Sequence, residues 1–522
     1  MTPSPSSGWQ AGAVKAPINE ELALHVRRLT SRFRVAEDHR RLLSQLGSQI
    51  VYASSVASEG FIDCSIALVR FSGAIEAAFG FTREIPFFYS PHRDLQIRTY
   101  HLAQSEIRNL PREVTPDIMM FWAPDPRLRE KLDDWSSGRF LAIPLTPQED
   151  LGAVGLVALM RDYIFTRDLF YETTPVRGDR FFGRRQLLQA LRDDIRNQRV
   201  AGLYGLRKAG KTSVLAELSD TISSPERVVV LRDLESLPSP PDDPIPDLIR
   251  DLTEDLRQRL KARGLRTQEL ARLSSESTLA DFKRALQAVL RAINEDGASV
   301  VLMLDEIEYL TPSDRIDVAE GDMTSVAQFL GVLRSLVQEN PNFTFVLSGL
   351  TSAITESGRL YGRPNPLFSW AKSYYLSPFT LDEASELARS TGAKMGIEIE
   401  PAALAAVFEA SGGHAYLYRH FASRVVEELP VEVYQRTMRH ADVLRASVAW
   451  RRSVAGNIQE IVEHVRRYYP DEAFLLDILR EDPSAFLELS QDVPQALEHL
   501  VSLGLIQLDG HEYELNPLLQ LL

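Results

Sequence analysis

A lysine and a threonine directly follow two spaced glycines in Gly205-Leu-Arg-Lys-Ala-Gly210-Lys211-Thr212. This spacing matches the phosphate-binding pattern Gly-x-x-x-x-Gly-Lys-Thr. Glycines let the backbone wrap closely, so that N–H groups converge on phosphate oxygens at the positive end of the following helix. We expect Lys211 to neutralise the β and γ phosphates and the Thr212 hydroxyl to be a ligand of Mg²⁺. The residues predicted to line the phosphates are Gly205, Arg207, Lys208, Ala209, Gly210, Lys211, Thr212 and Ser213.

Two adjacent carboxylates end an apolar run further along the chain, where Val300-Val-Leu-Met-Leu304 leads into Asp305-Glu306. A parallel strand delivers its C-terminal residues to the sheet edge where phosphates bind. We therefore expect Asp305 to hold Mg²⁺ through water and Glu306 to orient and deprotonate an attacking water. Glu308 is predicted to be a solvated or structural neighbour. The predicted reaction is the hydrolysis of ATP to ADP and phosphate, with Lys211, Asp305 and Glu306 as its catalytic residues.

A third apolar run, residues 343–349, ends in Ser348-Gly349. A polar side chain at the end of such a strand can sense the γ phosphate, which makes Ser348 a candidate nucleotide contact. A serine before a glycine also favours a simple turn. The sequence leaves both interpretations of Ser348 open.

Four continuous apolar runs must position these residues, and they alternate with amphipathic segments as central strands of a parallel sheet do. The runs are residues 200–205, 227–234, 299–306 and 343–349. They predict an α/β nucleotide-binding domain over residues 171–378. Helical periodicity predicts a helical lid and connector over residues 379–469. Three short helical patterns and a hairpin turn at Asp509-Gly510 predict a winged helix over residues 470–522.

The N-terminal region is predicted to be a separate α/β domain over residues 18–170, after a disordered tail at residues 1–17. Helical periodicity predicts helices through residues 18–83. Short apolar runs then alternate with amphipathic ones, which predicts a small parallel sheet of flavodoxin-like or Toll/interleukin-receptor-like type. The predicted strands are residues 85–90, 117–124 and 139–147. The fold class is thus α/β and multidomain.

Composition favours a protein of the cytoplasm with no membrane contact. The first residues have neither a basic nor an apolar segment of a secretory signal. The most apolar stretch, Leu151 to Met160, is only ten residues long, and a membrane-spanning helix needs about 20. A single cysteine, Cys64, cannot form an intrachain disulfide, which fits a reducing compartment.

Several motifs together resemble the signal-transduction ATPases with numerous domains, known as the STAND class and related to AAA+ proteins. The likeness is to the prokaryotic branch that includes the archaeal-type ATPases, and it covers about residues 171–450. The motifs are Phe181-Phe-Gly-Arg184, the glycine-rich loop, the LMLDE and LSG runs, and Ser411-Gly-Gly-His-Ala-Tyr416. The resemblance implies that Phe182 and Arg184 lie against the adenine. It implies that His414 opens a lid helix and either faces the nucleotide or caps the helix; Ala415 replaces the proline usual after this histidine.

The resemblance also implies a slow ATPase that acts as a signalling switch. ATP and Mg²⁺ would convert a closed monomer into an open homo-oligomer that controls the N-terminal domain, and hydrolysis would reset it. An unknown protein would be the trigger, and bacterial stress or anti-phage responses would be the setting.

Two other functions remain open on the sequence. A winged helix behind such a domain also occurs in origin-recognition ATPases that bind DNA. The net charge of the chain is −14, and residues 471–522 hold eleven acidic residues against one basic residue, which makes DNA an improbable partner. The N-terminal domain is expected to be a sensor or protein-interaction domain; alternatively it is an effector enzyme, an NADase or a nuclease, gated by the ATPase.

Overall fold

The computed structural model describes residues 20–56, 63–110, 114–115, 117–136, 140–145, 152–238, 242–274, 277–311, 324–434, 436–510 and 512–521. The predicted tail, residues 1–17, lies outside them. The chain divides into two compact units. The first comprises Met1–Leu169, Ser390–Glu398 and Leu429–Thr437, and the second comprises Phe170–Arg389, Ile399–Glu428 and Met438–Leu522.

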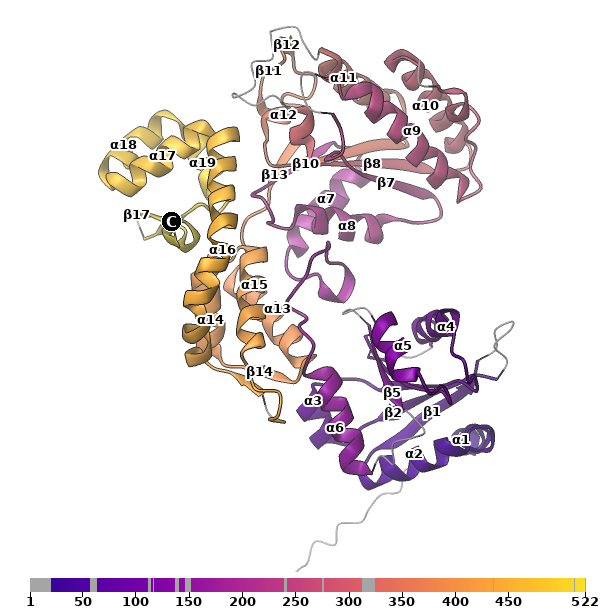
Figure 1. The fold of residues 1–522 in the computed structure, drawn as a ribbon. Helices are drawn as coiled ribbons and strands as arrows, with labels where there is room; N and C mark the ends of the chain where they lie inside the picture. The colour runs from indigo at the N-terminus through magenta and orange to yellow at the C-terminus, as the bar shows by residue number, and fades with distance from the viewer. Residues whose placement is uncertain are drawn as a thin grey trace, which may run out of the picture. The chain divides into compact units, whose positions relative to one another are not determined.

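A mixed sheet of five strands forms the first unit, with the strands in sequence order. β1, β2 and β3 are antiparallel neighbours, whereas β3, β4 and β5 are parallel. The strands are β1 Gln49–Ser55, β2 Ser65–Arg70, β3 Ile85–Tyr89, β4 Ile118–Trp122 and β5 Leu141–Leu145. Figure 1 draws this unit from indigo to magenta.

Helices cover both faces of this sheet, so the unit has two apolar cores. The helices are α1 Glu20–Arg32, α2 Arg34–Gln45, α3 Gly73–Phe79, α4 Ile97–Arg108, α5 Leu128–Trp135 and α6 Ala153–Ile164. α1, α2, α3 and α6 contribute to one core, and α4 and α5 to the other. Alternate residues of β3 enter opposite cores, with Phe87 and Tyr89 in the first and Phe88 in the second, as the two-residue period of a strand requires.

The antiparallel half of the sheet corrects two predictions. Residues 18–83 are not helical throughout, because β1 and β2 lie within them, and the N-terminal sheet is mixed rather than parallel. The first five residues of β2 are all buried. A short continuous apolar run of this kind cannot be distinguished from a buried helix by periodicity alone. The three strands predicted from residue 85 onwards are confirmed as β3, β4 and β5.

Five parallel strands form the sheet of the second unit, in the order β13-β6-β10-β8-β7. The strands are β6 Ala201–Tyr204, β7 Arg227–Asp233, β8 Ser299–Asp305, β10 Phe343–Gly349 and β13 Lys372–Tyr375. The four predicted strands are confirmed. The edge strand β13 escapes prediction because Lys-Ser-Tyr-Tyr is not an apolar run and its side chains are no more than half-buried.

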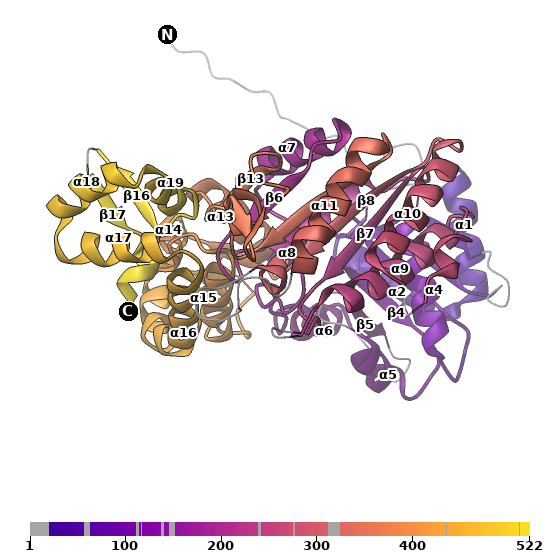
Figure 2. The same cartoon turned by 90° about the horizontal axis from the view of Figure 1, so that it is seen from above.

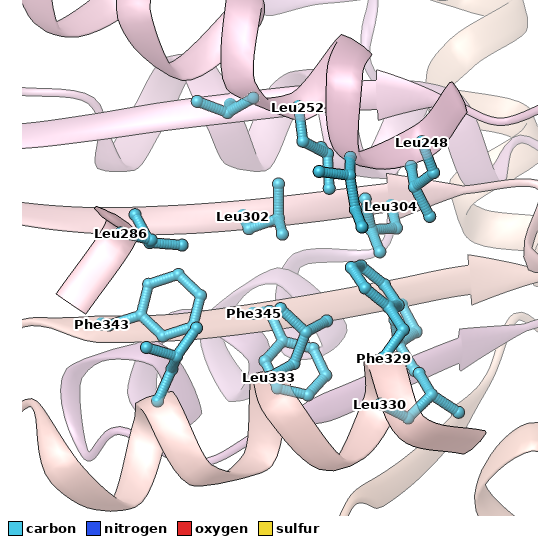
Figure 3. Close-up of a cluster of buried hydrophobic side chains, with 14 of the residues drawn as sticks. Leu248, Leu252, Leu286, Leu302, Leu304, Phe329, Leu330, Leu333, Phe343 and Phe345 are labelled. Atoms are coloured by element: carbon cyan, nitrogen blue, oxygen red, sulfur yellow. The ribbon is translucent and has the colours of Figure 1, made fainter. Parts of the chain in front are cut away.

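Helices pack on both faces of this sheet, and this packing holds the ends of its strands in place. α7 Arg185–Arg196 and α8 Lys211–Ile222 lie on one side, and α9 Ile245–Lys261, α10 Leu279–Asn294 and α11 Thr324–Glu339 lie on the other (Figures 1 and 2). In Figure 3, leucines of α9 and α10 and apolar residues of α11 meet those of β8 and β10. The side chains labelled there are at most 1% exposed, so the strands that carry the polar motifs rest on a close-packed core.

Helices make up most of the second unit beyond this sheet, as predicted. They are α12 Ala353–Glu356, α13 Leu381–Ala393, α14 Pro401–Ser411, α15 Ala415–Glu427 and α16 His440–Tyr468. A short pair, β11 Arg359–Leu360 with β12 Arg363–Pro364, accompanies them, whereas the pair β14 Ile397–Ile399 with β15 Arg436–Met438 falls mostly within the segments of the first unit. The ring of Phe421 in α15 stacks on Trp450 in α16 at 4.2 Å between centroids. None of the helices described has an apolar stretch long enough to cross a lipid bilayer.

The C-terminal module, residues 470–521, has three helices and an antiparallel hairpin. Its elements are α17 Pro470–Glu481, α18 Pro483–Asp492, α19 Pro494–Ser502, β16 Ile506–Asp509, β17 Glu512–Leu515 and the 3₁₀ turn Pro517–Leu521. The turn between the strands contains Gly510 at φ +62, a left-handed conformation that glycine adopts without strain. The predicted helices and hairpin are therefore present.

A histidine joins this module to the end of the central sheet. His499 of α19 lies between two carboxylates, with Nδ1 at 2.5 Å from Glu472 of α17 and Nε2 at 3.0 Å from Glu356 of α12. The Tyr375 hydroxyl donates to the other oxygen of Glu356 at 2.8 Å, and the Ser352 N–H donates to the Tyr469 hydroxyl at 3.1 Å. Because α12 follows β10, the module is attached directly beside the strand that ends in Ser348.

Candidate nucleotide-binding site

A cavity of about 510 Å³ lies at the C-terminal edge of the central sheet in the second unit. One part of its lining comes from the glycine-rich loop, the start of α8 and the end of β8, and the other mixes apolar and aromatic residues with polar ones. The first part comprises Arg207, Lys208, Ala209, Gly210, Lys211, Thr212, Ser213, Glu306 and Glu308. The second includes the apolar and aromatic residues Phe170, Tyr171, Pro175, Phe181, Phe182, Val214, Phe379, Leu387 and Tyr416, and the polar residues Glu172, Thr173, Thr174, Arg180, Arg184, Arg419 and His420. Such a cavity has the size and character of a small-ligand site.

The glycine-rich loop connects β6 to α8, which is the strand–loop–helix context that the motif requires. Lys208 at φ +58 and Gly210 at φ +104 are both left-handed, and they turn the backbone so that Lys211 begins the helix. The Lys211 ammonium donates to the carbonyls of Gly205 and Leu206, each at 3.1 Å. Burial lowers the pKa of Lys211, and the carboxylates of Glu308 and the acid pair oppose this shift. Two loop carbonyls thus hold the Lys211 side chain within the loop.

Thr212 and Asp305 meet across the gap between α8 and β8. The Thr212 hydroxyl donates to Asp305 Oδ2 at 2.6 Å, and the Glu306 N–H donates to Asp305 Oδ1 at 3.1 Å. Asp305 is 1% exposed. A hydroxyl and a carboxylate side by side are hard oxygen ligands of the kind Mg²⁺ prefers, so the two residues fit a magnesium ion.

Glu306 occupies a strained position at the end of β8. Its backbone is left-handed, at φ +60, which non-glycine residues seldom adopt and which is common at functional sites. Burial, followed by the nearby carboxylates of Glu308 and Asp233, raises the pKa of Glu306 to about 7. Asp233, Glu235 and Glu306 bring carboxylate oxygens within 4.8 Å of one another. A carboxyl group with a near-neutral pKa is suited to accept a proton from water.

Glu308 has a structural role that its spacing from Asp305 did not reveal. Its Oε2 accepts the Leu350 N–H at 3.0 Å, and the carboxylate lines the cavity. A β-carbon on Gly349 would lie 2.5 Å from Glu308 Oε2, so the glycine lets the two strand ends approach. Of the two predicted roles for Glu308, solvated or structural, the structural one is observed. In the sequence, the only sign of this close contact is the glycine that follows Ser348.

Two predicted nucleotide contacts, Ser348 and Ser213, have other surroundings in the structure. Ser348 is fully buried on β10, between β6 and β8, and it is not among the residues that line the cavity. Its hydroxyl has no hydrogen-bond partner within the described ranges. Ser213 lines the cavity, but its hydroxyl accepts the Val176 N–H at 3.1 Å. Ser213 therefore contacts the segment that precedes 3₁₀ turn Gly178–Arg180.

The lid and connector helices contact the phosphate loop through its non-glycine residues. His414, the N-cap residue of α15, donates from Nε2 to the Arg207 carbonyl at 3.0 Å. Burial lowers the pKa of His414 to about 4, so the ring is neutral at pH 7. The Arg207 side chain pairs with Glu460 of α16 at 3.0 Å, and the Lys208 ammonium lies 4.7 Å above the Tyr416 ring of α15. His414 therefore contacts the phosphate loop, and its side chain makes no capping hydrogen bond to α15.

Phe182 and Arg184 both line the cavity, but Arg184 is occupied with the start of the lid. Its guanidinium donates to the Ser377 carbonyl and lies 4.6 Å from the centre of the Phe379 ring. Its backbone N–H donates to Glu383 at 2.8 Å. Burial lowers the pKa of Arg184 to about 10. Phe182 is half-buried in the apolar part of the lining.

Solved structures resemble the chain in general fold only. The Walker-type ATPase of Pyrococcus abyssi has 17% identity and a TM-score of 0.49, with 67% of this chain and 98% of that chain covered. The ORC2 protein of Aeropyrum pernix has 14% identity and a TM-score of 0.40, covering 67% and 94%. The RuvB branch migration motor of Thermotoga maritima has 14% identity and a TM-score of 0.32, covering 64% and 92%. TM-scores below 0.5 carry no functional conclusion, and no curated protein matches the sequence.

A family model gives the firmer result. Residues 172–430 match the family described as novel STAND NTPase 1. The matched segment holds the phosphate loop, the Asp305-Glu306 pair and the helices α13 to α15. The family match implies nucleotide binding. The chain therefore carries a P-loop NTPase domain of the STAND class over residues 172–430.

Proposed function

We propose that this protein binds ATP with Mg²⁺ in the cavity, hydrolyses it slowly, and uses the bound state as a signalling switch. One observation carries the proposal. The hydroxyl of Thr212, which lines the cavity next to Lys211 at the start of α8, lies 2.6 Å from the carboxylate of Asp305, which is buried and not part of the lining. This combination of a hydroxyl, a carboxylate and a buried ammonium is the chemistry that a metal-bound triphosphate requires.

The residues of the site divide the work of hydrolysis. Lys211 neutralises phosphate charge, and the N–H groups of the loop and of the first turn of α8 bind phosphate oxygens. Glu306 orients a water molecule and takes a proton from it, which its raised pKa favours. When bound, Mg²⁺ supplies charge neutralisation of the phosphates. Thr212 and Asp305 are the residues that would hold it.

Contacts between the phosphate loop and later helices support the switch. His414 and Tyr416 of α15 and Glu460 of α16 all contact the loop residues Arg207 and Lys208. A nucleotide bound to this loop can therefore favour one arrangement of α15 and α16 over another. A ligand shifts a conformational equilibrium only by binding one state more tightly than the other. The C-terminal module, which we interpret as a winged helix, is attached to the same sheet through His499 and Glu356.

The acidic C-terminal module favours a protein partner over DNA. It has no lysine, its one arginine, Arg480, donates to the Leu519 carbonyl, and His499 lies between two carboxylates, which leaves little positive charge for phosphate backbones. We infer that ATP-bound copies associate with one another after a protein trigger acts, and that this association controls the N-terminal domain. Bacterial stress or anti-phage signalling is the setting that we propose.

Molar mass measured by light scattering after size-exclusion chromatography tests the switch. The protein would be run with Mg²⁺ and either ADP or a non-hydrolysable ATP analogue, with Glu306→Gln plus ATP as a second way of retaining the triphosphate. We expect a monomer with ADP and an oligomer in both triphosphate states. Equal molar mass in all states, in a protein shown to bind both nucleotides, would contradict the switch; NAD cleavage independent of nucleotide would favour the effector alternative.

A further inference from the structure

An exposed segment without regular structure forms one wall of the nucleotide cavity. Residues 170–176 line the cavity, and most of their residues from Tyr171 to Pro175 are exposed to solvent. We call residues 171–178 the strap. The strap has no sheet partner among the described residues, so its position depends on side chains that reach it from elsewhere.

Three side chains of α8 hold the strap. They occupy positions 213, 217 and 220, and residues spaced by four and three lie on one face of a helix. The contacts are Ser213 Oγ to the Val176 N–H at 3.1 Å, Glu217 Oε2 to the Gly178 N–H at 2.7 Å, and Asp220 to Arg177 at 2.8 Å. Two of the three are hydrogen bonds to the strap backbone, which fix its path independently of the strap's own side chains.

The lining that the strap contributes is suited to a nucleoside rather than to phosphate. The strap lines the cavity with Tyr171, Glu172, Thr173, Thr174, Pro175 and Val176, none of which is a cation, and the neighbouring aromatic residues Phe170, Phe181 and Phe182 belong to the same lining. A purine base stacks on such surfaces. The phosphate chemistry belongs to the other part of the lining, at Lys211 and Thr212.

We propose that Ser213 is a positioning residue for the nucleoside end of the nucleotide, acting through the strap, and that it does not bind phosphate. The proposal rests on the proposed function, because it needs a nucleotide in this cavity. Ser213 directly follows Thr212, so its place in the motif favours a phosphate contact; its hydroxyl instead accepts a strap N–H. Since ordering a free segment costs conformational entropy, a strap that is already held strengthens nucleoside binding.

Titration calorimetry with two ligands separates the two roles. ADP contains a nucleoside and phosphates, whereas inorganic tripolyphosphate contains only phosphates. For Ser213→Ala we expect ADP affinity to fall about 3- to 10-fold, as for the loss of one hydrogen bond, and tripolyphosphate affinity to stay at the wild-type value. Glu217→Ala, which removes the acceptor of the Gly178 N–H, should weaken ADP binding in the same selective way.

Two further variants control for structure. Ser213→Thr keeps the hydroxyl and should retain the wild-type ADP affinity. Ser219→Ala makes the same change six residues further along α8, at a position outside the cavity lining, and should leave both affinities unchanged. Circular dichroism and thermal unfolding of each variant check that the fold is kept.

The outcomes separate this inference from the function on which it rests. Equal loss of ADP and tripolyphosphate binding in Ser213→Ala would make Ser213 a phosphate ligand and overturn the inference. Unchanged binding of both ligands would also overturn it, because the strap would then not depend on Ser213. If the wild-type protein bound neither ligand, the proposed function itself would fail.

Discussion

Glu306 combines three features that support the general-base role proposed for it. It ends a strand beside Asp305, its backbone is held at φ +60, and burial with neighbouring carboxylates raises its pKa to about 7. The backbone strain places the side chain at the edge of the sheet rather than in line with β8. Such strain persists only where the surrounding structure enforces it.

The role of Glu306 gives a prediction for ATP turnover. Glu306→Gln keeps the size of the side chain but cannot take a proton from water, so turnover should fall about 10²- to 10⁴-fold, while MgATP still binds. Phosphate release and calorimetry measure the two properties. Glu235→Gln is the matched control, because its carboxylate belongs to the same group of acids and its loss should leave most of the turnover. If Glu306→Gln turned over at the wild-type rate, another residue would be the base.

The sequence predicts the position of a residue when a short motif contains it. It does not predict contacts between residues that are far apart in the chain. Lys211, Thr212 and Asp305 follow from the phosphate loop and from an acid at the end of an apolar run. The role of Glu308 depends on its close contact with Gly349. The role of Ser213 depends on a hydrogen bond from Val176, a strap residue 37 positions earlier in the chain. No short motif contains such information.

At the scale of elements, His499 connects α19, α17 and α12. Burial lowers its pKa, but the hydrogen bonds with Glu356 and Glu472 outweigh burial and raise the pKa of His499 to about 9. Although burial raises the pKa of Glu356, its hydrogen bonds lower it to about 2. A protonated ring can donate to both carboxylates at once, whereas a neutral ring has only one N–H.

This arrangement predicts a loss of stability at high pH. The folded pKa of His499 is above the unfolded value of about 6.5, so its contribution is complete below pH 6.5 and is lost as the pH rises through about 9. Urea unfolding at pH 7 and pH 10, followed by tryptophan fluorescence, measures this loss.

His499→Gln supplies the comparison for that measurement. It should destabilise the protein by about 3 kcal/mol at pH 7, because two carboxylates lose their cation, and the further loss at pH 10 should be smaller than in wild type. An equal loss in both proteins would assign the pH effect to other groups.

Elements were predictable where their periodicity was distinct. Four of the five strands of the nucleotide-binding sheet are continuous apolar runs, and apolar residues recur every three to four residues in the helices after residue 379. The sequence does not distinguish β2 from a helix, because its apolar run, residues 66–69, is short and shows no alternation. β13 was missed because tertiary pairing with β6, rather than its own polar sequence, makes it a strand.

For the whole molecule, the distribution of charge decides between partners. Most of the net charge of −14 belongs to residues 471–522, the part whose three helices and hairpin would otherwise favour DNA. Fluorescence anisotropy should therefore detect no binding of duplex DNA at physiological salt. Affinity that fell steeply with added salt would indicate phosphate contacts and would revive the origin-recognition alternative.

The most direct test of the account is MgATP binding by wild type and Lys211→Ala, measured by titration calorimetry. Lys211 lies in the phosphate loop with its ammonium buried, so its loss should weaken binding about 10- to 100-fold, as for a hydrogen bond to a charged group. Lys208→Ala removes a lysine of the same loop whose ammonium lies over Tyr416, and should weaken binding less. Unchanged MgATP affinity in Lys211→Ala would contradict the central claim that this cavity binds the nucleotide.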